Sequence, residues 1–256
     1  MTEDVTFSIQ DHVATITLNR PQKLNAVTPA MAAAIVDHVE RCNGDDDVRC
    51  VIVTGAGEKA FCAGSDIGGL DRYDTPWHFR NRPDYCDAIR RLLKPAIAAV
   101  NGYAFGGGLE TALSCDIRIA SENARFAAPE IKLGWIGGGG MTTFLAHSIG
   151  WSNTALMIMT GDPIPASQAL AWGLVSEVVP QADLLTRARG IAATIAARAP
   201  IAAETAKLNL RAAFSMPLDQ AIEYERDLQT ICFATEDASE GRAAFKEKRQ
   251  PIFRRK

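Results

Sequence analysis

The chain has 256 residues, of which 47% are hydrophobic and 22% charged, and its formal net charge is −3 at pH 7. That composition is typical of a folded water-soluble protein, and the slightly acidic balance argues against general nucleic-acid binding. No run of eighteen apolar residues predicts a membrane span, and the acidic start of the chain, MTEDVTF, lacks the apolar segment of a signal peptide. We therefore expect a cytoplasmic protein that binds neither membrane nor nucleic acid.

Neither the cysteines nor the histidines have the spacing of metal or thiol chemistry. The six cysteines form no CxxC pair, and the four histidines stand at no zinc-ligand spacing from them. Without a secretion signal, the thiols are expected to be reduced and to fill small core positions. The sequence therefore predicts no metal site and no catalytic cysteine.

The first part of the chain predicts strands and one helix. Alternating apolar residues at 5–9 and 13–18 predict a β-hairpin. Thr28 and Pro29 predict the start of a helix over 30–41, because proline is favoured at the first helical position. The continuous apolar run at 50–54 predicts a strand buried on both faces.

A dinucleotide-binding fingerprint appears at the end of this buried run. Gly55, Gly57 and Ala60 have the GxGxxA spacing after a strand. The helix that should follow is interrupted at once by residues 61–64, so the helix terminus that binds phosphate is missing. We therefore reject a nucleotide-binding site of this type.

The stretch from Lys94 to Gly140 carries the features that predict a reactive site. A strand is predicted at 96–100, followed by three glycines at 106–108, a helix over 109–115 and another strand at 116–120. A helix that starts on glycines leaves its first backbone N–H groups bare, which suits a developing negative charge.

A second strand–glycine junction lies at 63–67, after another buried strand. Two such junctions on neighbouring strands could aim two N–H groups at one point. Two acids lie near that point in sequence: Glu110 in the first turn of the helix, and Glu130 after the next strand. Either could be a solvent-exposed acid, but the apolar residues that flank both favour burial.

The rest of the chain predicts an α/β core followed by helices alone. Residues 73–84 are expected to form a loop or irregular helix that lines a pocket. Helices are predicted at 85–93, 141–150, 153–159 and 167–172, a last strand at 174–179, and long helices at 184–198, 200–214, 218–232 and 238–248. We expect the core to span 1–195 and the helical C-terminal region to span 196–256.

Six ordered segments of the sequence resemble the crotonase, or enoyl-CoA hydratase/isomerase, superfamily. They are RPQKLNAV (20–27), AFCAGSDI (60–67), NGYAFGGGLETALSCDIRIA (101–120), FAAPEIKLG (126–134), TGDPIPASQALAWGLVSEVV (160–179) and EGRAAFKEKRQPIF (240–253). The resemblance implies an α/β fold, a crotonase-like spiral of repeated β-β-α units, with a C-terminal helical region that packs in trimers. It implies an acyl-CoA thioester substrate, a homotrimer or a dimer of trimers, and no separate cofactor, because coenzyme A is part of the substrate.

The resemblance also implies roles for particular residues. The backbone N–H groups of Ser65 and Gly107 correspond to the oxyanion hole that holds the thioester oxygen, and Gly138 corresponds to a position that helps to place a water molecule. Glu110 and Glu130 correspond to the two catalytic glutamates, and the presence of both implies hydration of a trans-2-enoyl-CoA. One acid would act as base while the other delivers a proton to the α-carbon.

Contacts with coenzyme A are implied for residues from three parts of the chain. They are Lys23, Leu24, Ala63, Asp66, Ile67, Phe245 and Lys248. For Asp66 a helix-start carboxylate is an equally weighted alternative. The Arg-Arg-Lys end of the chain and Lys248 could also be solvated surface.

The sequence departs from the family pattern after the second glutamate. Many hydratases have Pro-Gly and then Thr-Gln-Arg-Leu there, whereas this chain reads WIGGGGMTTF from Trp135 to Phe144. Trp135 would narrow or reshape the acyl pocket, unless it serves packing alone.

Three classes of function remain open at this stage. The first is an enoyl-CoA hydratase, and the second is an isomerase or another acyl-CoA reaction such as thioester hydrolysis or C–C cleavage. The third is a non-catalytic scaffold that binds coenzyme A or RNA. The pair Glu110 and Glu130 favours the first, because a scaffold has no need of both acids.

Overall fold

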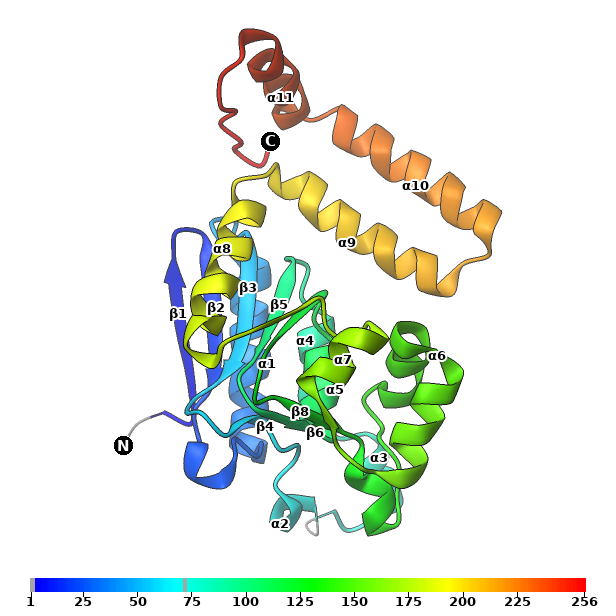
Figure 1. Ribbon diagram of the computed structural model, residues 1–256. Helices are drawn as coiled ribbons and strands as arrows, with labels where there is room; N and C mark the ends of the chain where they lie inside the picture. The colour runs from blue at the N-terminus through cyan, green and yellow to red at the C-terminus, as the bar shows by residue number, and fades with distance from the viewer. Residues whose placement is uncertain (1–2, 71–72) are drawn as a thin grey trace.

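The computed structural model describes residues 3–70 and 73–256, and Figure 1 shows their arrangement. Residues 1, 2, 71 and 72, which the predicted core includes, lie outside the described residues. A six-stranded sheet has the order β1-β2-β3-β5-β7-β10. Its strands are β1 (Val5–Gln10), β2 (Val13–Leu18), β3 (Cys50–Gly55), β5 (Ala96–Val100), β7 (Ile117–Ser121) and β10 (Glu177–Val179).

The two faces of this sheet are covered by different helices, because successive side chains of a strand point to opposite faces. Only β1 and β2 pair antiparallel; the other neighbours are parallel. One face packs on α8 (Leu184–Ala196), whose Leu184, Ala188 and Ala192 recur every four residues. The other face contacts the larger core, which includes buried residues of α1 (Pro29–Gly44) and α5 (Gly107–Leu113).

A second sheet of four short strands lies beside the first, in the order β4-β6-β8-β9. The strands are β4 (Ala60–Cys62), β6 (Tyr103–Phe105), β8 (Arg125–Ala127) and β9 (Ile164–Pro165). Each of the first three follows a strand of the large sheet, so two strands and the next helical segment form a unit that occurs three times. The predicted fold, a spiral of β-β-α units, is confirmed, although the sequence analysis did not predict these four short strands.

The helices between the strands differ in detail from those predicted. The region predicted at 73–84 as a loop or irregular helix contains α3 (Pro76–Arg80), and α2 (Ile67–Leu70) precedes it. The helix predicted at 85–93 is present as the shorter α4 (Tyr85–Arg90). The two helices predicted at 141–150 and 153–159 correspond to α6 (Met141–Thr160), which is interrupted at Gly150. The backbone of Gly150 is not helical, with φ 77° and ψ 169°, and it divides α6 into two helical segments as predicted. The remaining short elements are η1 (Pro21–Lys23), η2 (Pro129–Leu133), α7 (Ala166–Trp172) and η3 (Gln181–Asp183).

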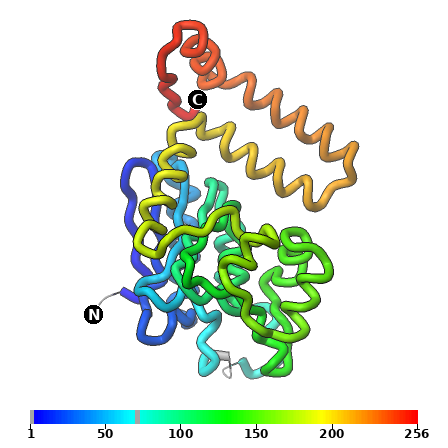
Figure 2. Tube along the Cα trace, in the orientation of Figure 1, coloured from blue at the N-terminus to red at the C-terminus, as the bar shows by residue number. Residues whose placement is uncertain are grey.

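The chain ends in three helices that extend away from the sheets (Figure 2). They are α9 (Pro200–Ser215), α10 (Leu218–Phe233) and α11 (Glu236–Glu247). Several of their large apolar side chains are exposed, including Leu210, Leu218, Phe233 and Phe245. No described helix combines the length and the apolar character that a membrane span requires.

Ion pairs connect α9 and the end of the chain to the sheet, a group that we call the junction cluster. Buried Lys94 pairs with Glu204 at 3.0 Å, and Arg255 contacts the same carboxylate. Buried Lys207 pairs with Asp116 at 2.7 Å and donates to the carbonyl of Lys94 at 2.9 Å. These contacts fix α9 on the core.

Candidate active site

A cavity of about 1070 Å³ lies where the segments that follow the short strands meet. The residues after β4, the region of α3 and α4, the start of α5, η2 and the glycine run 137–140 all contribute to its wall. Eight of the residues predicted from the sequence line it: Ala63, Ser65, Ile67, Gly107, Glu110, Glu130, Trp135 and Gly138. The cavity therefore gathers residues that are up to 77 positions apart, from 63 to 140.

Glu110 is held at the cavity wall by backbone amides. It lies in the first turn of α5 and is 5% exposed. Its Oε1 accepts hydrogen bonds from the amides of Gly139 at 2.6 Å and Met141 at 3.3 Å. Burial raises the pKa of Glu110 to about 7, against these hydrogen bonds and with a further upward contribution from Glu130.

Glycines give this carboxylate its space. A β-carbon at Gly137 would lie 2.8 Å from Oε1 of Glu110, and one at Gly139 would lie 2.8 Å from Oε2. Larger residues at these two positions would therefore displace the acid.

Glu130 follows β8 in the 3-10 helix η2 and approaches the cavity from the other side. Its Oε1 packs against Gly106, where an added β-carbon would lie 2.8 Å away. Its Oε2 is buried without a hydrogen-bond partner in the described part of the chain. Burial raises the pKa of Glu130 as well. A buried carboxyl without a partner favours the protonated form, which can donate a proton.

The two strand–glycine junctions approach each other closely. A β-carbon at Gly64, whose φ is +97°, would lie 3.1 Å from the amide nitrogen of Gly107. Val27 forms a bridge with Ser65 through its own amide and carbonyl, which contact Gly64 and Asp66 at 2.8 and 2.9 Å. Across residues 3–70 and 73–256, the amides of Ser65 and Gly107 donate to no other protein group. The cavity thus has two free donors and two acids in its wall.

A family model described as Enoyl-CoA hydratase/isomerase matches residues 8–256. The chain belongs to this family. Glu110, Glu130, Ser65 and Gly107 line one cavity of this family member.

Known members of the family are similar to the chain over nearly its whole length. The (E)-benzylidenesuccinyl-CoA hydratase of Thauera aromatica is 39% identical over 98% of both chains. The 2,3-dehydroadipyl-CoA hydratase of Escherichia coli is 39% identical over 96% of this chain and 97% of that one. A solved enoyl-CoA hydratase from Bacillus anthracis has a TM-score of 0.94 and 35% identity, and the match covers 99% of this chain and all of that one.

The residues implied to contact coenzyme A lie in two places. Lys23 ends η1, and the carbonyl of Leu24 accepts the amide of Ala63 at 3.0 Å, so these residues lie beside the cavity wall. Asp66 pairs with Arg20 at 2.6 Å, and this hydrogen bond lowers the pKa of its carboxyl. Phe245 is an exposed residue of α11, and Lys248 follows that helix.

The C-terminal candidates do not reach the cavity of their own chain. Figure 1 shows α11 at one end of the molecule and α2 and α3 at the other. Neither Phe245 nor Lys248 lines the cavity. A role for them at this site would require a second copy of the chain.

The sequence analysis missed several residues of the site. Gly139 and Met141 donate amides to Glu110, and Gly106 makes room for Glu130. The glycine run was the only signal for the first of these contacts, because a run of glycines allows close backbone approach. Tyr85 of α4 also lines the cavity. Among the described residues, no three His, Cys, Asp or Glu side chains gather in a way that could hold a metal ion.

Proposed function

We propose that this protein adds water across the 2,3 double bond of a trans-2-enoyl-CoA thioester, as an enoyl-CoA hydratase. The observation that carries the proposal is that one cavity wall contains the buried carboxyl of Glu110, the partly buried carboxyl of Glu130, and two amides that donate to no other group of the described residues. Membership of the hydratase/isomerase family supports it, and so do hydratases among the similar proteins.

In the proposed reaction the amides of Ser65 and Gly107 both donate hydrogen bonds to the thioester carbonyl oxygen. As water adds to C3, negative charge develops on that oxygen in an enolate. Donors that are already in place stabilise this charge without reorganising, and each contributes roughly 3 kcal/mol. Both amides are available for this role because, among the described residues, the backbone hydrogen bonds at the two junctions are made by adjacent residues and not by these amides.

Glu110 is proposed as the base and Glu130 as the acid. The two amide hydrogen bonds to Glu110 favour its ionised form, which takes a proton from the attacking water. Glu130 accepts no hydrogen bond at Oε2, and it delivers its proton to C2 as the carbonyl reforms. The water oxygen is then bonded to C3, and the proton on Glu110 must return to Glu130, directly or through solvent, before the next turnover.

The rest of the implied site is proposed as the holder of the acyl-CoA. Lys23, Leu24, Ala63, Asp66 and Ile67 would contact the coenzyme A part, and Gly138 would help to place the water. Phe245 and Lys248 would reach the site from a neighbouring copy in a homotrimer or dimer of trimers. The exposed apolar side chains of α9 and α10 provide a surface for that assembly.

Activity is tested by the loss of the conjugated thioester absorbance with purified protein. Glu110→Gln and Glu130→Gln should each lower kcat at least about 100-fold, the lower end of the range for general acid–base groups. Binding of saturated butyryl-CoA, measured by calorimetry, should change little, since neither acid is assigned to it. Full hydration by both variants would exclude the assigned acids.

The acyl group is tested with a panel of enoyl-CoA esters. Trp135 and Ile136 line the cavity, so the acyl end is bounded by large apolar residues. The panel contains crotonyl-CoA, a branched ester, an aryl ester and an ester with a terminal carboxylate, since similar hydratases are named for esters of the last two kinds. If the protein forms an isomerised, hydrolysed or cleaved product and no hydrated product, the proposed hydration is wrong and the protein catalyses another reaction of the family.

A further inference from the structure

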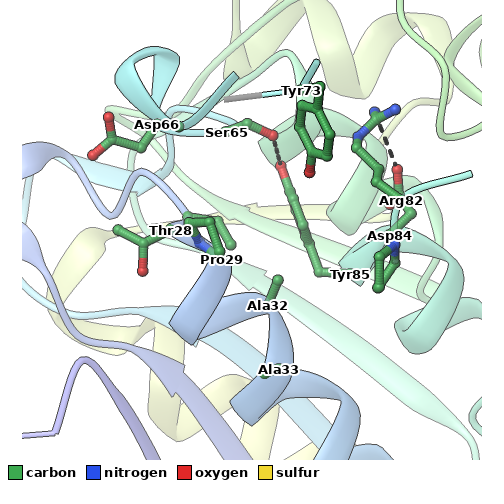
Figure 3. A pocket seen from close by; sticks show the side chains of 13 residues that line it. Thr28, Pro29, Ala32, Ala33, Ser65, Asp66, Tyr73, Arg82, Asp84 and Tyr85 are labelled. Atoms are coloured by element: carbon green, nitrogen blue, oxygen red, sulfur yellow. Dashed lines mark hydrogen bonds and ion pairs between the residues drawn. The ribbon is translucent and has the colours of Figure 1, made fainter. Parts of the chain in front are cut away.

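Tyr85 lies between the two proposed oxyanion donors, and its position has no counterpart in the predicted site. It is the first residue of α4, whose N-cap Asp84 accepts the amide of Cys86 at 2.8 Å. Its side chain is 6% exposed. Figure 3 shows the ring directed toward Ser65, and the two hydroxyl oxygens are 3.2 Å apart.

The same hydroxyl packs against Gly107. A β-carbon added to Gly107 would overlap the hydroxyl oxygen of Tyr85, so the contact requires glycine. The next residue, Cys86, donates from Sγ to the carbonyl of Gly107 at 3.4 Å, and Thr111 donates to the same carbonyl at 2.7 Å. The start of α4 therefore contacts both junctions. Tyr85 contacts the side chain of Ser65 at the first junction, and Tyr85 and Cys86 contact Gly107 at the second.

Each junction contains a glycine with positive φ. Gly64 and Gly106, which precede Ser65 and Gly107, have φ values of +97° and +54°, a region that glycine adopts with less steric cost than other residues. An oxyanion hole is effective only when its donors hold their places as charge develops. A bridge between the two junctions would provide that restraint.

We propose that Tyr85 is a positioning residue, whose hydroxyl bridges Ser65 and Gly107 and fixes the separation of their two amides. The proposal rests on the oxyanion role given to these amides in the proposed function. It assigns the hydroxyl no contact with the substrate; its effect passes through the two backbone donors.

The surroundings of Tyr85 keep the bridge unchanged across the working pH. Burial raises the pKa of its hydroxyl well above the usual value, so the group remains protonated. Tyr85 is also in the wall of both the large cavity and a smaller one of about 150 Å³, and Ser65, Arg82 and Asp84 are in both walls as well. Phenylalanine would keep the ring and remove the hydroxyl alone.

The test is a double-mutant cycle of Tyr85→Phe, Ser65→Ala and the double variant. Ser65→Ala keeps the backbone amide. Each single variant should lower kcat about fivefold to tenfold, the value of one hydrogen bond, and leave KM within about twofold. The double variant should be no slower than the singles, because all three lack the same bond. The ratio of wild-type to Tyr85→Phe rates should not change with pH.

A spectroscopic measurement separates this inference from hydration itself. Butyryl-CoA labelled with ¹³C at the thioester carbonyl cannot be hydrated, and its carbonyl stretching frequency reports the two donors directly. The frequency should be lower when bound to wild type than when bound to Tyr85→Phe. The control is Tyr103→Phe, an exposed tyrosine of β6 that lines neither cavity, which should match wild type in rate and frequency.

The outcomes are distinct. A protein that hydrates enoyl-CoA while its rates and carbonyl frequency are unaffected by Tyr85→Phe keeps the proposed function and overturns the bridge. If the protein hydrates no enoyl-CoA ester and the frequency difference is still observed, the proposed function is wrong and the bridge by Tyr85 is supported. The bridge would also be contradicted if the kcat losses of the two single variants multiply in the double variant, because the two hydroxyls would then act independently.

Discussion

Two groups of buried charge lie in this molecule, and they are arranged in opposite ways. In the active-site cavity Glu110 and Glu130 have no ion-pair partner among the described residues, and burial raises the pKa of both. In the junction cluster, Lys94, Lys207 and Arg255 each contact a carboxylate.

Under the proposed function, the unpaired acids serve the reaction and the paired charges serve the structure. A buried charge costs free energy unless a partner compensates it, so unpaired acids reduce stability and are retained where their shifted pKa is useful. A buried cluster of paired charges contributes little net free energy to folding, but removing one member destabilises the fold because it leaves the partner charge uncompensated. Mutations should therefore weaken folding in the junction cluster and weaken turnover in the cavity.

The largest expected effect is on folding, from Lys207→Met. The change leaves Asp116 without its partner at 2.7 Å and the carbonyl of Lys94 without a donor. The free energy of unfolding should fall by about 3 kcal/mol or more, measured by denaturant titration. Lys246→Met, at an exposed position of α11, is the control and should stay within about 0.5 kcal/mol of wild type. Equal values for the two variants would mean that the junction cluster contributes no more than surface charge.

Gly139→Ala should affect turnover rather than folding. Its β-carbon would lie 2.8 Å from Oε2 of Glu110 and push the acid from its place. A displacement of about 1 Å costs on the order of 100-fold in kcat, which steady-state kinetics would show. Gly190→Ala, in open space on α8, is the matched control and should keep the wild-type kcat. An unchanged kcat in Gly139→Ala would show that the exact place of Glu110 does not limit turnover.

Glu110→Gln should stabilise the protein, and more so at high pH. The pKa of Glu110 is raised from 4.5 to about 7, so the folded state holds the proton more tightly than the unfolded state. The stability from that proton is complete below pH 4.5 and is lost as the pH rises to about 7. The difference in stability between the glutamine variant and wild type should therefore shift in favour of the variant by on the order of 3 kcal/mol between pH 4 and pH 8. Thermal unfolding at both pH values measures this, and a constant difference would contradict it.

The smallest of these effects is on the pH dependence of kcat/KM. Activity should fall about tenfold per pH unit as the pH drops below about 7, because Glu110 must be ionised to act as base. It should fall again at higher pH, as Glu130, whose pKa is also raised, loses the proton that it donates. Glu130→Gln, assayed for its residual rate, should lose the high-pH limb and keep the low-pH limb. If the low-pH limb disappears instead, the two roles are exchanged.

The sequence predicted the long elements and the burial of Glu110 for physical reasons that are visible in the structure. The apolar runs of β3 and β5 are buried on both faces, and the heavily apolar surroundings of Glu110 correspond to its real burial. The short strands were beyond prediction, because two or three residues carry no periodicity. The pair β6 and β8, for example, depends on parallel partners more than twenty positions away.

Contacts between distant residues were the other limit. Nothing near Tyr85 in sequence indicates that its hydroxyl meets Ser65 and Gly107, since the contact arises only when α4 packs beside α5. Similarly, the four glycines at 137–140 predicted close backbone approach, but only the folded chain identifies Gly139 as the donor to Glu110.

The way in which Glu110 is held has a consequence for how this enzyme can change. The hydrogen bonds that hold Glu110 come from the backbone amides of Gly139 and Met141, and the side chains of the residues before them do not contribute to these bonds. Leu133, at the end of η2, and Trp135 and Ile136, which follow it, line the cavity. Substitutions at these three positions should leave the hydrogen bonds to Glu110 in place. A library randomised at these three positions should yield active variants with altered acyl preference at high frequency, which makes this segment a natural starting point for directed evolution.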